Sequence, residues 1–188
     1  MELVKDFAPV IALIIYYTVV EYKKLLKKKN KSKEFINSTY ITIEINRLLK
    51  EIQLFTGANR VHIMTFHNTM ESLTKKCYYF MDMRYEETDA HTKPVMKEMQ
   101  NIPCTQFAES QAIIHQDGVL YIDETSNSKL GRYHTALGIK SAYKYRIGKS
   151  IANGVLAITW YETGKRLTER QKQFVLNKLT ELETILKY

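Results

Sequence analysis

Two stretches of the chain carry apolar residues at the spacing of an amphipathic helix. The first runs from Glu34 to Gly57, and glycine commonly ends a helix. The second begins at a capping box formed by Thr168 and Gln171. The apolar residues recur every three or four positions: Ile41, Ile45, Leu48, Ile52 and Phe55 in the first stretch, and Val175, Leu179, Leu182 and Leu186 in the second. The pattern predicts a helix at each end of the folded part of the chain.

Between these helices, five short stretches rich in β-branched, aromatic or other apolar residues predict strands. They are Arg60–Phe66, Cys77–Tyr85, Val119–Ile122, Ser141–Ile147 and Gly154–Tyr161. Residues 86–117 show no clear period, and we expect a loop there with one short helix over Pro94–Met99. Residues 125–138 predict a loop and a short helix. This order of elements predicts an α+β domain, in which an antiparallel sheet has helices packed on one face and is flanked by the N- and C-terminal helices.

The segment Phe7–Val20 is apolar on all sides of a predicted helix. Extended to Tyr22 it covers about 24 Å, which is short against a hydrocarbon core of about 30 Å. Three interpretations are open: a membrane anchor with flanking lysines that snorkel to the interfaces, a helix buried in protein, and a cleaved signal peptide. The two acidic residues among the first six argue against a signal peptide. We expect one N-terminal transmembrane helix within residues 1–22.

A block of lysines follows this segment and dominates the charge of the protein. The net charge is +8, from 28 basic and 20 acidic residues. Seven of these charges come from Lys23, Lys24, Lys27, Lys28, Lys29, Lys31 and Lys33. A single block without interleaved aromatic residues argues against a nucleic-acid-binding face. By the positive-inside rule, we expect a single-pass membrane protein with its N-terminus outside and its domain in the cytoplasm.

The lysine block allows two interpretations at the membrane surface. It is either a flank of the membrane helix and nothing more, or a surface that attracts anionic inner-leaflet lipids. The resulting domain organisation is an anchor over residues 1–22, a basic juxtamembrane linker over residues 23–35, and a folded domain over residues 36–188.

Several short segments occur in the order of one known family. Leu137–Ser141 (LGIKS) leads into a strand, Gly154–Ile158 (GVLAI) forms the next strand, and Leu167–Gln171 (LTERQ) opens the last helix, while Gly118–Asp123 (GVLYID) fits a middle strand. Together these segments resemble the GAF domain, a small-molecule-sensing relative of PAS domains, over about residues 40–188. The resemblance implies a GAF-like fold and a signalling or sensor role.

The family places its ligand pocket between the sheet and the helix–loop region after the middle strand. The resemblance therefore gives six candidate ligand-binding residues: Tyr121, Asp123, Ser126, Leu130, Tyr133 and Tyr143. The alternative, in which large side chains simply fill this space, stays open. The resemblance does not specify a ligand or cofactor.

No complete catalytic or metal-binding motif is present in the sequence. Gly148-Lys149-Ser150 lacks the earlier glycine of a phosphate-binding loop, and the five histidines lack metal-ligand spacing. Cys77 and Cys104 have no evident cationic neighbour that would activate a thiol. The bilin-attaching cysteine and the cyclic-nucleotide signature of the family are not convincingly present either. We expect no enzymatic activity, no catalytic residues and no metal site.

These observations predict a membrane-anchored, cytoplasmic GAF-like module that regulates or assembles through an effector or assembly protein in trans. The alternative is a scaffolding protein of a membrane-associated assembly, such as a viral one, which uses the fold as an interaction surface. The two helical stripes named above also predict a parallel homodimer, with those nine residues as its seam. The competing interpretation is that both stripes pack on their own sheet.

Overall fold

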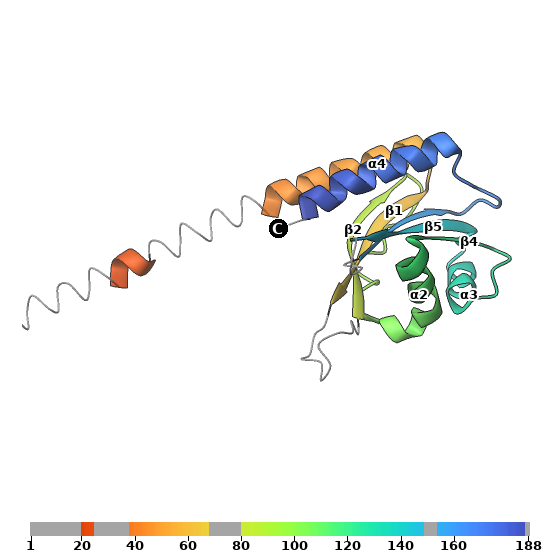
Figure 1. Ribbon diagram of the computed structural model, residues 1–188, viewed down its shortest axis with the longest axis horizontal. Coiled ribbons are helices and arrows are strands. Elements are labelled where there is room, and N and C mark those ends of the chain that lie inside the picture. The colour runs from red at the N-terminus through yellow and green to blue at the C-terminus, as the bar shows by residue number, and fades with distance from the viewer. Residues whose placement is uncertain (1–19, 25–37, 68–79, 149–153, 187–188) are drawn as a thin grey trace, which may run out of the picture. The chain divides into compact units, whose positions relative to one another are not determined.

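The structure is a computed structural model. It describes residues 20–24, 38–67, 80–148 and 154–186 (Figure 1). The chain divides into two compact units, residues 1–43 and residues 44–188. The described part of the first unit is helical, and the second unit contains the sheet.

Six strands form one antiparallel sheet in the order β3-β2-β1-β6-β5-β4. They are β1 (Arg60–His67), β2 (Phe80–Thr88), β3 (Ile102–Pro103), β4 (Val119–Asp123), β5 (Ser141–Ile147) and β6 (Gly154–Trp160). Five of them confirm the predicted strands. The strand predicted from Cys77 is found from Phe80 onward, and residues 77–79 lie outside the described residues. The two-residue strand β3 was not predicted.

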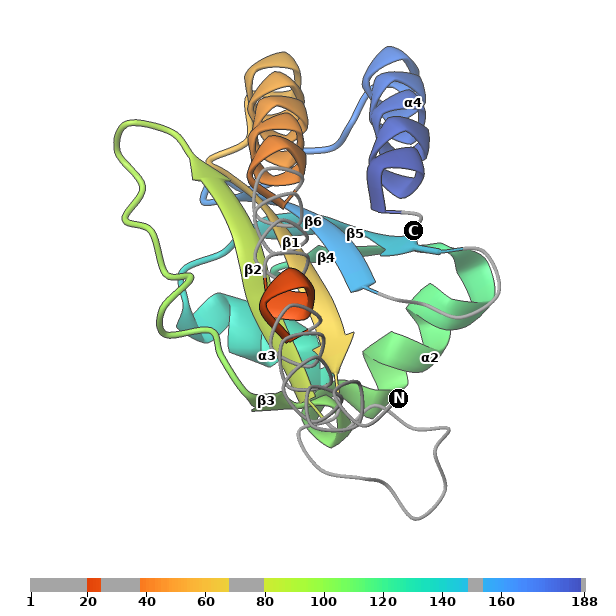
Figure 2. The same cartoon turned by 90° about the vertical axis from the view of Figure 1, so that its left-hand side faces the viewer.

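The two predicted amphipathic helices cover one face of the sheet. Residues 38–56 are helical and end at Gly57, whose φ of 65° suits a glycine. The helix α4 (Glu169–Leu186) begins at the predicted capping box, directly after Thr168. There the Gln171 amide donates to Thr168 Oγ1 over 3.2 Å, and the Thr168 amide donates to Gln171 Oε1 over 3.0 Å. Residues 44–56 lie beside α4 (Figure 2).

The other face of the sheet is covered as well, which corrects the prediction of helices on one face only. It carries η1 (Cys104–Phe107), α2 (Ala108–Asp117) and α3 (Lys129–Ala136) (Figures 1 and 2). On this side the core contains Met64, Met81, Met83, Phe107, Ile114, Ile122, Leu130 and Val155. The short helix predicted over Pro94–Met99 is a turn, in which the amides of Glu98 and Met99 both donate to the Val95 carbonyl.

The helical stripes lie in the core of a single copy of the chain. Ile45, Leu48, Ile52, Val175 and Leu182 have exposed fractions of 0–1%. Of the other predicted seam residues in the second unit, Phe55 stays 36% exposed, and Leu179 and Leu186 are half-buried. One chain therefore already buries most of the predicted seam, as expected for stripes that pack on their own sheet. The homodimer itself stays a prediction.

The predicted localisation has to be corrected. Within the described ranges, no helix combines the length and the apolar character needed to cross a bilayer. The proposed anchor over residues 1–22 lies outside the described residues except for residues 20–22. Of the seven lysines, Lys23 and Lys24 are described and exposed, and Lys24 pairs with Glu21 over 2.8 Å. The other five lie outside the described residues, and the predicted domain boundaries stay predictions.

Candidate functional site

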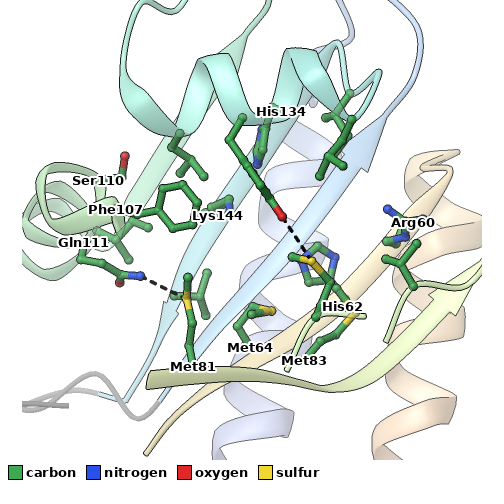
Figure 3. A pocket seen from close by; sticks show the side chains of 18 residues that line it. Arg60, His62, Met64, Met81, Met83, Phe107, Ser110, Gln111, His134 and Lys144 are labelled. Carbon is green, nitrogen blue, oxygen red and sulfur yellow. Dashed lines mark hydrogen bonds between the residues drawn. The ribbon is translucent and has the colours of Figure 1, made fainter. Parts of the chain in front are cut away.

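A cavity of about 50 Å³ lies between the sheet and the layer formed by α2 and α3 (Figure 3). Its apolar lining includes Met64, Met81, Met83, Ile114 and Val155. Its polar lining comprises Arg60, His62, Ser110, Gln111, Tyr133, His134 and Lys144. A mostly apolar cavity with a few convergent polar groups is the usual form of a small-molecule site.

The pairing of three strands brings two of these polar groups to the same face. His62 on β1 lies opposite Ala157 on β6, and Ala157 lies opposite Lys144 on β5. Residues in one cross-strand row point to the same side of a sheet. His62 and Lys144 therefore face the cavity with only the methyl group of Ala157 in the row between them. His134 reaches the same cavity from α3.

The two imidazoles are buried and incompletely hydrogen-bonded. His62 is 6% exposed and His134 is 5% exposed. The Nδ1 atom of each finds no hydrogen-bond partner among the described residues. Burial lowers the pKa of both imidazoles, that of His134 to about 2, and the nearby Lys144 ammonium lowers both further. Both rings are thus neutral near pH 7, and each unpaired nitrogen costs about 1–3 kcal/mol of stability.

Lys144 places a charge in this cavity without a counter-ion. Burial lowers the pKa of its amine to about 8, so the amine is still mostly protonated at pH 7. In the described part of the chain, no carboxylate forms an ion pair with it. The side chain is half-buried, and an ammonium withdrawn in part from water is normally paired, because desolvation of a lone charge is costly.

Arg60, the other basic residue of the lining, has a counter-ion, although its Nε atom makes no well-aligned hydrogen bond within the described residues. Its side chain and that of Glu86 are buried and form an ion pair over 2.8 Å. Arg60 Nη2 also donates a hydrogen bond to the Lys93 carbonyl over 2.9 Å. The Glu86 carboxylate in turn accepts the amides of Val95 and Met96 over 3.0 and 2.9 Å. This network fixes the turn at residues 95–96 at the edge of the cavity and leaves neither charge free.

Two of the six residues predicted to bind a ligand line this cavity, namely Leu130 and Tyr133. The Tyr133 hydroxyl donates to Met99 Sδ over 3.4 Å. Asp123 lies outside it and accepts the backbone amide and the hydroxyl of Thr125. Ser126 lies outside it too, with its hydroxyl 3.1 Å from that of Ser128.

The remaining two predicted residues face the opposite side of the sheet. Tyr121 and Tyr143 line a groove between β4, β5 and α4, and their ring centroids are 4.7 Å apart. The reason is strand alternation, since Lys144 points into the cavity and its neighbours Tyr143 and Tyr145 must point away from it. The two tyrosines therefore lie on the face of the sheet opposite to the cavity, and their role in ligand binding stays a prediction.

The sequence-based reasoning missed His62, His134 and Lys144. A signal for Lys144 was available, because it is the one charged residue in the first five positions of the strand SAYKYRI. Strict alternation along the strand places Lys144 on the opposite face of the sheet from Tyr143 and Tyr145. No comparable signal marks the two histidines, whose unpaired nitrogens are visible only in three dimensions.

The described residues offer little for thiol or metal chemistry. Cys104 is partly buried, and burial raises the pKa of its thiol to about 11, which leaves very little thiolate at neutral pH. Cys77 lies outside the described residues. No group of three or more His, Cys, Asp or Glu side chains in the described ranges is arranged to hold a metal ion.

Comparison with known proteins identifies the fold. A phycocyanobilin-bound GAF domain from a cyanobacterial phytochrome superposes with a TM-score of 0.64 at 16% identity, over 78% of this chain and 84% of that chain. A phycoerythrobilin-bound GAF domain from a cyanobacterial phytochrome gives 0.62 at 15% identity, over 78% and 85%. The chromophore-binding domain of a bacteriophytochrome from R. palustris gives 0.60 at 14% identity, over 82% and 60%.

No protein-family model matches the chain, and no curated protein matches it. At such low identities the solved structures establish the fold and nothing more. The sheet with its two covering layers is thus a GAF-like fold.

Proposed function

We propose that residues 44–188 form a regulatory domain that binds a small molecule in the cavity between the sheet and α2 and α3, and that the domain has no catalytic activity of its own. The observation that carries this proposal is the cluster of His62, His134 and Lys144. All three side chains line the cavity, and the Nδ1 atoms of His62 and His134 have no hydrogen-bond partner among the described residues. Burial lowers the pKa of the Lys144 amine, which forms no ion pair with a described carboxylate. Polar groups with these properties concentrate at binding sites.

Because side chains alternate along a strand, a ligand bound in the cavity can affect the helices on the opposite face of the sheet. His62 faces the cavity, whereas its neighbours Val61 and Ile63 are fully buried on the other side of β1. Lys144 is likewise flanked by Tyr143 and Tyr145, which face the α4 side. A displacement of β1 or β5 by a ligand therefore reaches the layer formed by residues 44–56 and α4.

We further propose that this helical layer passes the signal to an effector protein or to a second copy of the chain. Leu54 belongs to this layer, and its apolar side chain, 68% exposed in a single copy, is available for such a contact.

A thermal-shift screen of small metabolites against the full chain tests the proposal. At a concentration 100 times its Kd, a ligand of the native state adds about 2.7 kcal/mol of stability. Ser110→Leu would fill the cavity from α2, whereas Ala112→Leu adds the same bulk at an exposed position of the same helix. We expect at least one compound to stabilise the wild type and Ala112→Leu but not Ser110→Leu. A complete absence of hits, or hits unaffected by Ser110→Leu, would overturn the proposal.

A further inference from the structure

We propose that the ligand of this cavity is a small oxyanion, either a carboxylate or a planar inorganic oxyanion of about four heavy atoms. In this assignment the Lys144 ammonium is its counter-ion, and the imidazoles of His62 and His134 donate hydrogen bonds to it from Nδ1. The inference rests on the function proposed above and names the chemical class of the ligand.

The charge of the cavity selects an anion. The titratable groups of the cavity and its edge are Arg60 and His62 from β1, Glu86 from β2, Tyr133 and His134 from α3, and Lys144 from β5. Arg60 and Glu86 neutralise each other, and α2 contributes only the neutral Ser110 and Gln111 to the polar lining. One positive charge remains at Lys144, which would repel a cation and attract an anion.

The hydrogen-bonding capacity of the same groups points to an acceptor. An ammonium group has three donors and no acceptor. A neutral imidazole can carry its proton on either nitrogen, so each unpaired Nδ1 atom can be a donor once an acceptor fixes the tautomer. The charged oxygens of an oxyanion are acceptors and can satisfy all three groups together, which an amine cannot do.

The size of the cavity limits the ligand. One water needs about 10–15 Å³ on the same measure, so about 50 Å³ accommodates roughly four heavy atoms. Acetate, nitrate and bicarbonate have this size. A linear tetrapyrrole, such as the phycocyanobilin held by the similar GAF domain, is about ten times larger.

Binding of an anion should be coupled to protonation of Lys144. The free cavity binds the anion well only while the amine is charged. Above the pKa of about 8, we expect the affinity to fall by up to about tenfold per pH unit.

Isothermal titration calorimetry on the full chain tests the assignment, with sodium acetate, nitrate and bicarbonate as probes at constant ionic strength. Acetamide serves as the neutral analogue of acetate. Lys144→Met removes the charge, and Lys140→Met is the matched control, since Lys140 lies outside the cavity near Glu124. We expect at least one anion to bind the wild type and Lys140→Met, with a Kd at least tenfold higher for Lys144→Met and at pH 9.5, and no binding of acetamide.

Two results would overturn the assignment while leaving the proposed function intact. One is binding of acetamide as tight as that of acetate. The other is an anion affinity that changes neither with Lys144→Met nor between pH 7 and 9.5. The pH series and the acetamide comparison need no variant, so they decide the matter even if Lys144→Met does not fold. Failure of all three anions, with a hit in the metabolite screen, also rejects the oxyanion class, whereas failure of both assays rejects the proposed function.

Discussion

Replacement of Lys144 by methionine should stabilise the protein when no anion is present. The pKa of the amine falls from 10.5 in an unfolded chain to about 8 in the folded cavity. At 1.36 kcal/mol per pKa unit, this difference lowers the free energy of unfolding by about 3 kcal/mol below pH 8. Because the side chain is only partly buried, water screens some of this cost, and we expect a gain of about 2–3 kcal/mol. Methionine has a similar length and no charge, so it retains the packing of the stem.

The pH dependence of this gain has a definite sign. Between about pH 8 and 10.5 the unfolded chain binds one more proton at this position than the folded chain does. The stability of the wild type should therefore rise through this window relative to that of the variant. The gap between them should close above pH 10.5 and be largest below pH 8.

Urea unfolding of the wild type, Lys144→Met and Lys140→Met at pH 7 and at pH 10 measures both effects. At 2–4 °C per kcal/mol for a chain of this size, the melting temperature of Lys144→Met should also rise by about 4–12 °C. Lys140→Met should change little, because surface substitutions usually shift stability by less than about 0.5 kcal/mol. A Lys144→Met protein that is less stable than the wild type by 1 kcal/mol or more would refute the reasoning. Lys144 would then hold the structure together through a partner and would not be available to a ligand.

Three further predictions concern the packing and the thiol. Glu86→Gln leaves the buried Arg60 charge uncompensated and should cost about 3–5 kcal/mol in urea unfolding, and a loss below 1 kcal/mol would contradict the role of this pair. Ile45→Glu buries an unpaired carboxylate and should unfold the domain by circular dichroism, whereas Leu54→Glu should leave it folded. A folded, monomeric Ile45→Glu protein would instead place Ile45 at a seam between copies. Iodoacetamide should modify Cys104 at pH 7.5 at least tenfold more slowly in the folded than in the urea-unfolded chain, and equal rates in peptide mass spectrometry would contradict the raised pKa.

Local periodicity was enough to predict most of the fold. The stripes at Ile45 and Val175 repeat at the helical period, and the strands around Val61, Tyr143 and Leu156 are rich in β-formers. The helix α2 was missed because its two isoleucines are adjacent, so one is buried and the other exposed, and no stripe forms. The strand β3 has only two residues and carries no period at all.

The site could be predicted only in part, for a different reason. Sequence identifies a strand, but a shift of one residue moves every side chain to the opposite face. Tyr143 and Lys144 are neighbours of this kind, and of the two only Lys144 faces the cavity. The lack of partners for His62 and His134 depends on which elements surround them, and this follows from the tertiary packing alone.

Titration of the isotope-labelled full chain with sodium acetate and nitrate, followed by nuclear magnetic resonance, tests the central claim most directly. If the cavity is the binding site, the largest amide shifts with at least one anion should cluster at His62, His134 and Lys144, and the imidazole nitrogens should report Nδ1–H tautomers. Residues of the groove near α4, such as Tyr121 and Leu176, should shift less. Shifts that are absent, or that cluster in this groove and leave the cavity residues unchanged, would contradict the account.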